Sequence, residues 1–208
     1  MAVLEAERTQ TVGTDTTAAI GTGVERVEPY TLDFFLAFIT EYRDLRIELT
    51  SDGELIIMPP TFSKTGIRNA KLTVRLGVWA EQNDAGICFD SSTLFRLPNS
   101  AVRSPDASWI PKLRWQALSE TEQEGIAPLC PDFVAELRSK SDRLSTVQNK
   151  MREYMICGAK LGWLIDPISK RVEIYRPGQE VEIVDSPDTV SGEGVLPGFV
   201  LDLTNILE

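Results

Sequence analysis

The segment CPDFVAELRSKSD, residues 130–142, has the composition of a buried strand but carries two charges near its middle. Its apolar run follows a proline and ends at a serine-rich turn, which is typical of a strand bounded by loops. Because side chains alternate along a strand, Phe133 and Leu137 fall on one face, and Glu136 and Arg138 fall on the other. A charged pair on one strand face indicates either a solvated edge or a functional site, and the segment alone leaves both open.

The residues that follow favour a functional site. Ser145–Gln148 matches a capping box, and an amphipathic helix follows it and ends between Gly158 and Gly162. The segment GWLIDP then predicts a buried strand at 163–165, parallel to the Glu136 strand and adjacent to it. Such units bury the central strand on both faces and place ligands at the carboxyl ends of strands. The helix positions that we expect to be buried are Val147, Met151, Tyr154, Met155 and Ala159.

A second acidic residue occurs in a similar setting. Asp106 follows a proline in RSPDASWI, within a predicted short strand. It could be an ordinary turn aspartate. If its strand adjoins the Glu136 strand, however, the two carboxylates form a cleft of hard oxygen ligands suited to Mg²⁺ or Mn²⁺.

The first half of the chain predicts alternating helices and hairpins. A helix begins near Thr31, and RIELTSDGELIIMPP forms a hairpin around Asp52-Gly53. A second helix spans 63–83, and two strands flank Ser91-Ser92. In the second helix, the predicted buried face comprises Ile67, Leu72, Leu76 and Trp79. Beside it lie the cations Lys64, Arg68, Lys71 and Arg75. The segments VEIYRP and QEVEIV predict a C-terminal hairpin.

Composition excludes several classes of enzyme. The 208-residue chain contains no histidine, which rules out Ser-His-Asp triads, Cys-His nucleophiles and His-ligated zinc. It also lacks a phosphate-binding loop of the GxxxxGK[ST] type. We expect a disordered segment at 1–26 and a single domain at 27–208. With no secretory signal or membrane span, and with three unpaired cysteines, the sequence predicts a cytoplasmic protein.

Several segments together resemble one nuclease family: RSPDASW, CPDFVAELRSKSD, KMREYMICGAKLGWLIDP and VEIYRPGQEVE. They are similar to the Uma-type restriction endonucleases of the PD-(D/E)XK superfamily, and the likeness extends over residues 28–208. The resemblance implies an α/β fold with a restriction-endonuclease-like mixed central sheet, flanked by helices and extended by antiparallel hairpins. It also implies a metal-dependent endonuclease that hydrolyses DNA phosphodiester bonds.

The resemblance assigns roles to individual residues. Asp106 matches the motif aspartate and Glu136 the following acid, while Arg138 stands where the motif has lysine. Arginine is never deprotonated in proteins and therefore cannot act as a general base, although it can stabilise phosphate charge. Lys150, one helical turn before Tyr154, is the candidate for a lysine that has migrated onto the helix. Alternatively, Lys150 is an exposed helix residue.

Further ligands of the ion follow from the same resemblance. Glu48 resembles the upstream acidic residue of the family, or else it is a surface residue of its hairpin. We expect Mg²⁺ or Mn²⁺ to be held by Asp106, Glu136 and the backbone carbonyl of Leu137, with Glu48 directly or through water. Burial is expected to shift Lys150 toward acid–base behaviour.

The net charge of −10 opposes non-specific DNA binding, unless the helix cations at 64–75 or a homodimer build a positive groove. Two alternatives therefore stay open. One is a catalytically degenerate member of the fold that serves as a DNA- or protein-interaction module. The other is a ligand-binding α/β protein.

Overall fold

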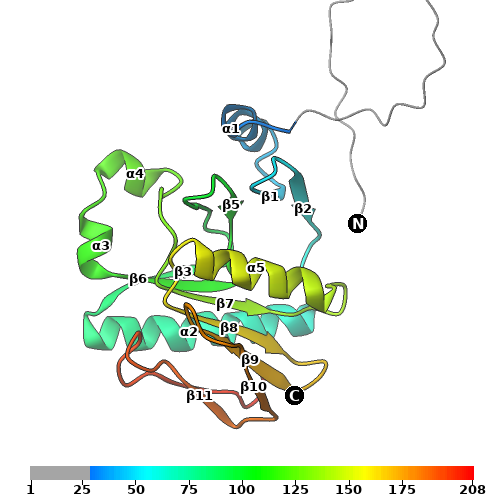
Figure 1. The fold of residues 1–208 in the computed structure, drawn as a ribbon, viewed down its shortest axis with the longest axis vertical. Helices are drawn as coiled ribbons and strands as arrows, with labels where there is room; N and C mark the ends of the chain where they lie inside the picture. The colour runs from blue at the N-terminus through cyan, green and yellow to red at the C-terminus, as the bar shows by residue number, and fades with distance from the viewer. Residues whose placement is uncertain (1–28) are drawn as a thin grey trace, which may run out of the picture.

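The computed structural model describes residues 29–208, so the predicted disordered segment 1–26 lies outside the described residues. Figure 1 shows a large sheet with helices on both faces, and a smaller helix-and-strand unit beside it. This is the predicted mixed α/β architecture with added hairpins. Within the described residues, no helix has the length and apolar content that a bilayer crossing requires.

The large sheet has the strand order β10-β9-β8-β7-β6-β3. Its strands are β3 (Gly86–Asp90), β6 (Ala107–Pro111), β7 (Phe133–Leu137), β8 (Leu161–Asp166), β9 (Arg171–Tyr175) and β10 (Glu182–Asp185). Strands β7 and β8 run parallel, and every other neighbouring pair is antiparallel. The structure thus confirms the predicted parallel neighbour at 163–165, which is fully buried, and the predicted C-terminal hairpin.

Two long helices cover the large sheet, one on each face. Helix α2 (Ser63–Asn83) packs on the face that carries Phe133 and Leu137, and α5 (Leu144–Ile156) packs on the face that carries Val134 and Leu164. Short helices α3 (Lys112–Gln116) and α4 (Glu120–Glu124) connect β6 to β7. Glu136 is buried on the α5 face, so the strand–helix–strand pattern that follows it correctly favoured the interior over a solvated edge.

The smaller unit contains α1 (Leu32–Glu41) and a sheet of order β2-β1-β5-β4. Its strands are β1 (Arg46–Leu49), β2 (Leu55–Met58), β4 (Phe95–Arg96) and β5 (Val102–Arg103). Thr31 caps α1 by accepting a hydrogen bond from the Phe34 amide, and Gly53 adopts a positive φ of 78° in the predicted hairpin turn.

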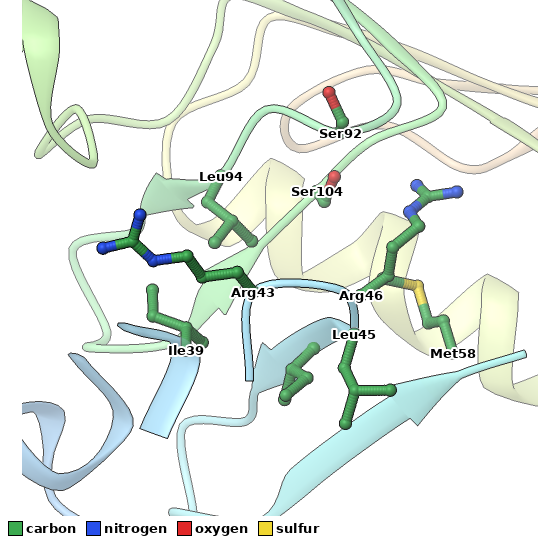
Figure 2. Close-up of a pocket in the computed structure, with 9 residues that line it drawn as sticks. Ile39, Arg43, Leu45, Arg46, Met58, Ser92, Leu94 and Ser104 are labelled. Carbon is green, nitrogen blue, oxygen red and sulfur yellow. The ribbon is translucent and has the colours of Figure 1, made fainter. Parts of the chain in front are cut away.

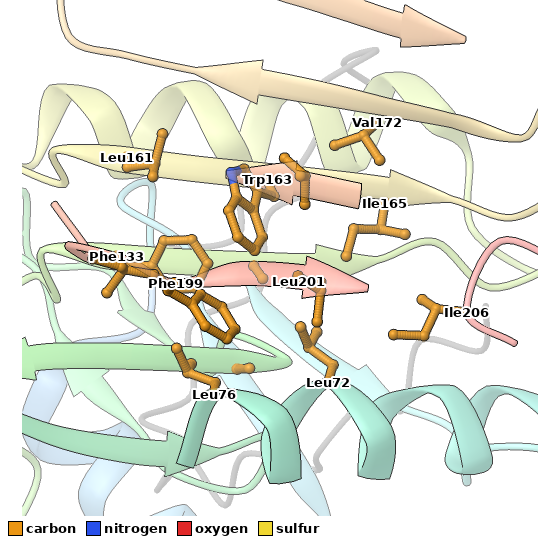
Figure 3. Packing of buried hydrophobic residues seen from close by; sticks show 14 of the residues in the cluster. Leu72, Leu76, Phe133, Leu161, Trp163, Ile165, Val172, Phe199, Leu201 and Ile206 are labelled. Atoms are coloured by element: carbon orange, nitrogen blue, oxygen red, sulfur yellow. The ribbon is translucent and has the colours of Figure 1, made fainter. Parts of the chain in front are cut away.

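The C-terminal segment completes the core on the α2 side. Strands β11 (Thr189–Ser191) and β12 (Val200–Asp202) form a two-stranded sheet. Figure 3 shows Phe199 and Leu201 lying between the large sheet and Leu72 and Leu76 of α2. In the same cluster, the rings of Phe133 and Trp163 pack edge to face, with their centroids 4.7 Å apart.

Two local predictions were wrong. Helix α5 begins at Leu144 without a side-chain cap, so Ser145 lies inside its first turn, and Gln148 instead donates a hydrogen bond to Glu173. Ile67 is 57% exposed. It precedes Leu72 by five residues, and five residues of an α-helix do not return to the same face. The two strands predicted on either side of Ser91-Ser92 are present as β3 and β4, and they belong to different sheets.

Candidate active site

Glu136 lies near the end of β7, on the face covered by α5, and its side chain is almost completely buried. Its Oε1 atom accepts hydrogen bonds from the Lys150 ammonium at 2.9 Å and from the Tyr154 hydroxyl at 3.1 Å. Lys150 and Tyr154 are four residues apart on α5, so both reach the same side of the sheet. The two candidate residues on the helix and the candidate acid on the strand therefore meet.

Glu48 joins this group from the smaller sheet. It lies on β1 with 2% of its surface exposed, and its Oε1 accepts hydrogen bonds from Lys150 Nζ and from the Ser104 amide, each at 2.8 Å. Its Oε2 accepts from Arg103 at 3.2 Å. Glu48 is therefore a buried residue of the cluster, and the alternative of a surface hairpin residue is wrong.

Asp106 approaches Glu136 through the pairing of β6 with β7. The register that pairs Ala107 with Ala135 brings Asp106, the preceding residue, beside Glu136. Its Oδ2 accepts a hydrogen bond from the Leu137 amide at 2.8 Å, and its Oδ1 accepts from Asn69 Nδ2 of α2 at 3.1 Å. The sheet therefore brings together acids that are 30 residues apart in the sequence.

Lys150 links the carboxylates. Its ammonium lies between Glu48 and Glu136 and also donates to the Ser104 carbonyl at 3.2 Å. Burial alone would lower the pKa of Lys150, but Glu136 and Glu48 outweigh it and raise the pKa above its ordinary value. The shift expected from burial was therefore in the wrong direction. A raised pKa favours the protonated ammonium of Lys150 at neutral pH and argues against a role as general base.

The pKa values of the three carboxylates shift in different directions. Burial raises the pKa of Glu136 to about 7, with further contributions from Asp106 and Glu48, although Lys150 opposes the change. Burial also raises the pKa of Asp106. Burial opposes ionisation of Glu48 as well, but there Lys150 and Arg103 prevail and lower the pKa. One ammonium therefore does not neutralise the whole cluster.

Arg138 does not join this cluster. Its guanidinium donates to Asp166 Oδ2 at 2.8 Å and to the Asp142 carbonyl at 3.4 Å. Asp166 lies at the end of the parallel neighbour β8 and is itself held by Ser169. The expectation that Arg138 points into the site is wrong, because its guanidinium pairs with the buried carboxylate of Asp166 instead.

Sequence reasoning missed three residues that orient the acids. Asn69 holds Asp106, the Ser104 backbone contacts both Glu48 and Lys150, and Arg103 bridges Glu48 and Glu153. Arg103 and Ser104 directly precede the Pro-Asp dipeptide, a proximity that could have suggested a role. Nothing in the local pattern of the α2 helix distinguishes Asn69.

The residues fit a divalent cation in their chemistry. Carboxylates from β1, β7 and the residue before β6 gather here, two of them buried and Asp106 half-buried. In addition, the Asn69 Oδ1 atom beside Asp106 is buried without a hydrogen-bond partner. Carboxylate and amide oxygens are the ligands that Mg²⁺ prefers. Across residues 29–208, however, no three acidic, Cys or His side chains gather closely enough to hold an ion by themselves. The Lys150 ammonium lies between Glu48 and Glu136.

Comparison with known proteins places this geometry in context. Residues 32–204 match the model of a family described as "Putative restriction endonuclease" (Uma2). The chain is also similar to a solved structure from Anabaena variabilis, described as a putative nuclease belonging to DUF820. The TM-score is 0.72 at 23% identity, over 86% of this chain and 98% of that chain. This likeness confirms the predicted fold class. No curated protein matches the sequence.

Proposed function

Because the chain belongs to the Uma2 family of restriction endonucleases, we propose that it is an endonuclease that hydrolyses DNA phosphodiester bonds with Mg²⁺ or Mn²⁺. The observation that carries the proposal is that Glu48 and Glu136 both pair with the Lys150 ammonium, while the pairing of β6 with β7 brings Asp106 beside Glu136. Carboxylates from separate strands with one adjacent cation are an arrangement suited to phosphoryl transfer.

In this proposal Asp106 and Glu136 hold the ion, together with the Leu137 carbonyl, and Glu48 supports it. When bound, the ion would polarise the scissile phosphate and lower the pKa of the attacking water. The hydrogen bonds that Asp106 accepts from Asn69 and from the Leu137 amide fix its orientation.

Lys150 contributes positive charge. Because its pKa is raised, it remains protonated and can neutralise the charge that develops on the phosphate. Tyr154 holds Glu136 from the opposite end of the same helical turn. Burial and the nearby acids also raise the pKa of Tyr154, so its hydroxyl stays a neutral donor.

A nicking assay on supercoiled plasmid with Mg²⁺ or Mn²⁺ tests this function. Wild-type protein should cut, and Glu136→Gln and Lys150→Ala should each reduce the rate at least about 100-fold, the usual cost of losing one electrostatic group of an active site. Calorimetry should show that Lys150→Ala still binds the metal, because the carboxylates remain. Arg138→Lys, the matched control, should cut like the wild type, because Arg138 contacts Asp166 and not the cluster.

A second function has an observation in its favour. The Lys150 ammonium already bridges two of the acids, and the net charge of −10 opposes DNA binding. A catalytically degenerate member that acts as an interaction module would have this arrangement. In that case wild-type protein would cut no DNA form with either metal, and calorimetry would detect no metal binding.

A further inference from the structure

A pocket of about 270 Å³ adjoins the carboxylate cluster, between the smaller unit and the turn that follows β3. Figure 2 shows its lining, with Ser92 and Ser104 on one side, Leu45 on the opposite side, and two arginines extending to the flanks. The lining consists of Ile39, Arg43, Leu45, Arg46, Ile47, Met58, Ser92, Leu94 and Ser104.

Ser104 connects this pocket to the proposed catalytic groups. Its backbone carbonyl accepts from Lys150 and its amide donates to Glu48, while its hydroxyl donates to the Ser91 carbonyl. A molecule that occupied the pocket would therefore lie one residue away from the carboxylates. The pocket is contiguous with the site, but it contains none of the proposed metal ligands.

The lining combines an apolar surface with positive charge. Arg46 donates to the Ser91 carbonyl, and within the part of the chain that the structure describes it forms no ion pair with a carboxylate. Arg43 is exposed, and among residues 29–208 its guanidinium donates only through Nε, to the Thr40 carbonyl. Both guanidinium groups therefore keep donors that can bind a phosphate.

The cations on α2, by contrast, are partly engaged. Arg68 donates to the Glu208 carbonyl, and Arg75 pairs with Asp202 at 3.5 Å. In a chain with a net charge of −10, the pair of arginines that lines the pocket therefore supplies local positive charge that can attract a phosphate.

Size limits the occupant. Ligand pockets usually measure about 300–1,000 Å³, so this one is suited to a single small group and not to a double helix. An aliphatic surface flanked by guanidinium groups matches an unstacked base and its phosphate, and a base is accessible in this way only when it is unpaired or flipped out.

We propose that this pocket binds one unpaired nucleotide of a DNA strand next to the scissile phosphate, with Arg46 on the phosphate and Leu45 against the base. The inference rests on the proposed nuclease function and names its substrate class. The enzyme then prefers single-stranded or locally opened DNA to an intact duplex, and Arg46 positions the strand without touching the reacting atoms.

Fluorescence anisotropy in EDTA tests the pocket without metal or cleavage. The probes are a short labelled oligothymidine and a blunt duplex of the same length. Wild-type protein should bind the single strand about tenfold more tightly, as expected when one base is buried against an apolar lining. Leu45→Trp, which fills the pocket from a side chain that is already 39% exposed, should weaken single-strand binding about tenfold. Arg46→Gln should weaken it by a similar factor and reduce its salt dependence.

Matched controls separate the pocket from general surface effects. Leu113→Trp adds the same ring at a side chain that is 82% exposed on α3, and Arg152→Gln removes the same charge from the outer face of α5. Both should bind like the wild type, and circular dichroism should show that all four variants fold. Equal affinity for the two probes, no binding of either, or unchanged binding by Leu45→Trp would overturn the inference.

Failure of the nucleotide pocket in this binding experiment can be distinguished from failure of the nuclease function in the nicking assay. Plasmid cleavage without strand preference would leave the nuclease function standing and remove the nucleotide pocket. Pocket-dependent binding of the single strand without cleavage would support the pocket and remove the catalytic function.

Discussion

At the scale of single residues, this site depends on which charges meet in the interior. A buried lysine alone would lose its proton readily, yet Lys150 keeps it because Glu48 and Glu136 each lie within 3 Å of its nitrogen. The direction of the Arg138 side chain is likewise set by its partner, Asp166, rather than by the position of Arg138 in the motif. The identity of a residue therefore indicated its charge, while its neighbours decided its role.

The pair of Arg138 and Asp166 predicts a pH dependence of stability. Burial opposes ionisation of Asp166, but Ser169 and Arg138 outweigh it and lower the pKa below the usual value. A lowered folded-state pKa stabilises the protein above the unfolded value of about 4, and this contribution is lost as the pH falls through the folded value.

Asp166→Asn should therefore lower the free energy of unfolding at pH 7 by about 1–3 kcal/mol, the cost of leaving a buried hydrogen-bonded charge without its partner. The difference from the wild type should shrink below about pH 4. Urea denaturation at several pH values measures both effects. A difference that stays constant from pH 7 to below pH 4 would contradict this assignment.

At the scale of elements, the close approach of helices and strands to one another sets the geometry of the site. Helix α5 holds Lys150 over the sheet because Gly162 on β8 leaves room for Met151 and Met155 above it. On the other side of the sheet, Gly86 on β3 lies against the backbone carbonyl of Ile110 and the Trp109 ring. The two glycines differ in what surrounds them, one facing flexible side chains and the other facing backbone.

This difference predicts unequal effects of adding a methyl group. Gly86→Ala should destabilise the fold by about 3 kcal/mol, because a strand backbone cannot move away from the added carbon. Gly162→Ala should cost only about 1 kcal/mol, since the terminal methyl groups of two methionines can shift. Thermal unfolding of the two variants compares them directly. A larger loss for Gly162→Ala would mean that α5 packs more rigidly than its methionines suggest.

At the scale of the whole molecule, the core depends on segments from both ends of the described chain. The C-terminal residues cover the α2 side of the large sheet, where Leu201, Leu203 and Ile206 are buried beside Leu72. Meanwhile Glu48 of the smaller unit reaches the cluster on the α5 side. We propose that residues 27–208 form one domain, because both its core and its site draw on distant parts of the sequence.

Neighbouring residues of β12 test this role of the C-terminal segment. Leu201 is completely buried, whereas Val200 is 56% exposed. Leu201→Ala should lower the free energy of unfolding by about 2–5 kcal/mol, the cost of a cavity in the core. Val200→Ala, the matched control, should change it by less than about 0.5 kcal/mol. Similar values for the two variants in urea denaturation would show that β12 does not complete the core.

Much of the local structure follows from the sequence itself. Alternation in FVAEL, helical spacing in 144–156 and the Asp52-Gly53 turn depend on neighbouring residues only, and each predicted its element correctly. The strand patterns also indicated Glu136 and Asp106 as candidates, and the likeness to a known family adds Glu48 and Lys150. The local elements could be predicted because propensity and periodicity act over a few residues.

The contacts within the site depend on the tertiary structure. Strand register brings Asp106 beside Glu136, and the packing of α5 places the Lys150 ammonium between Glu136 and Glu48, residues that the sequence separates widely. The same packing directs Arg138 to Asp166 and brings Asn69 to Asp106. No local pattern encodes these pairings, because each depends on where distant backbones meet and on which opposite charge lies closest when water is excluded.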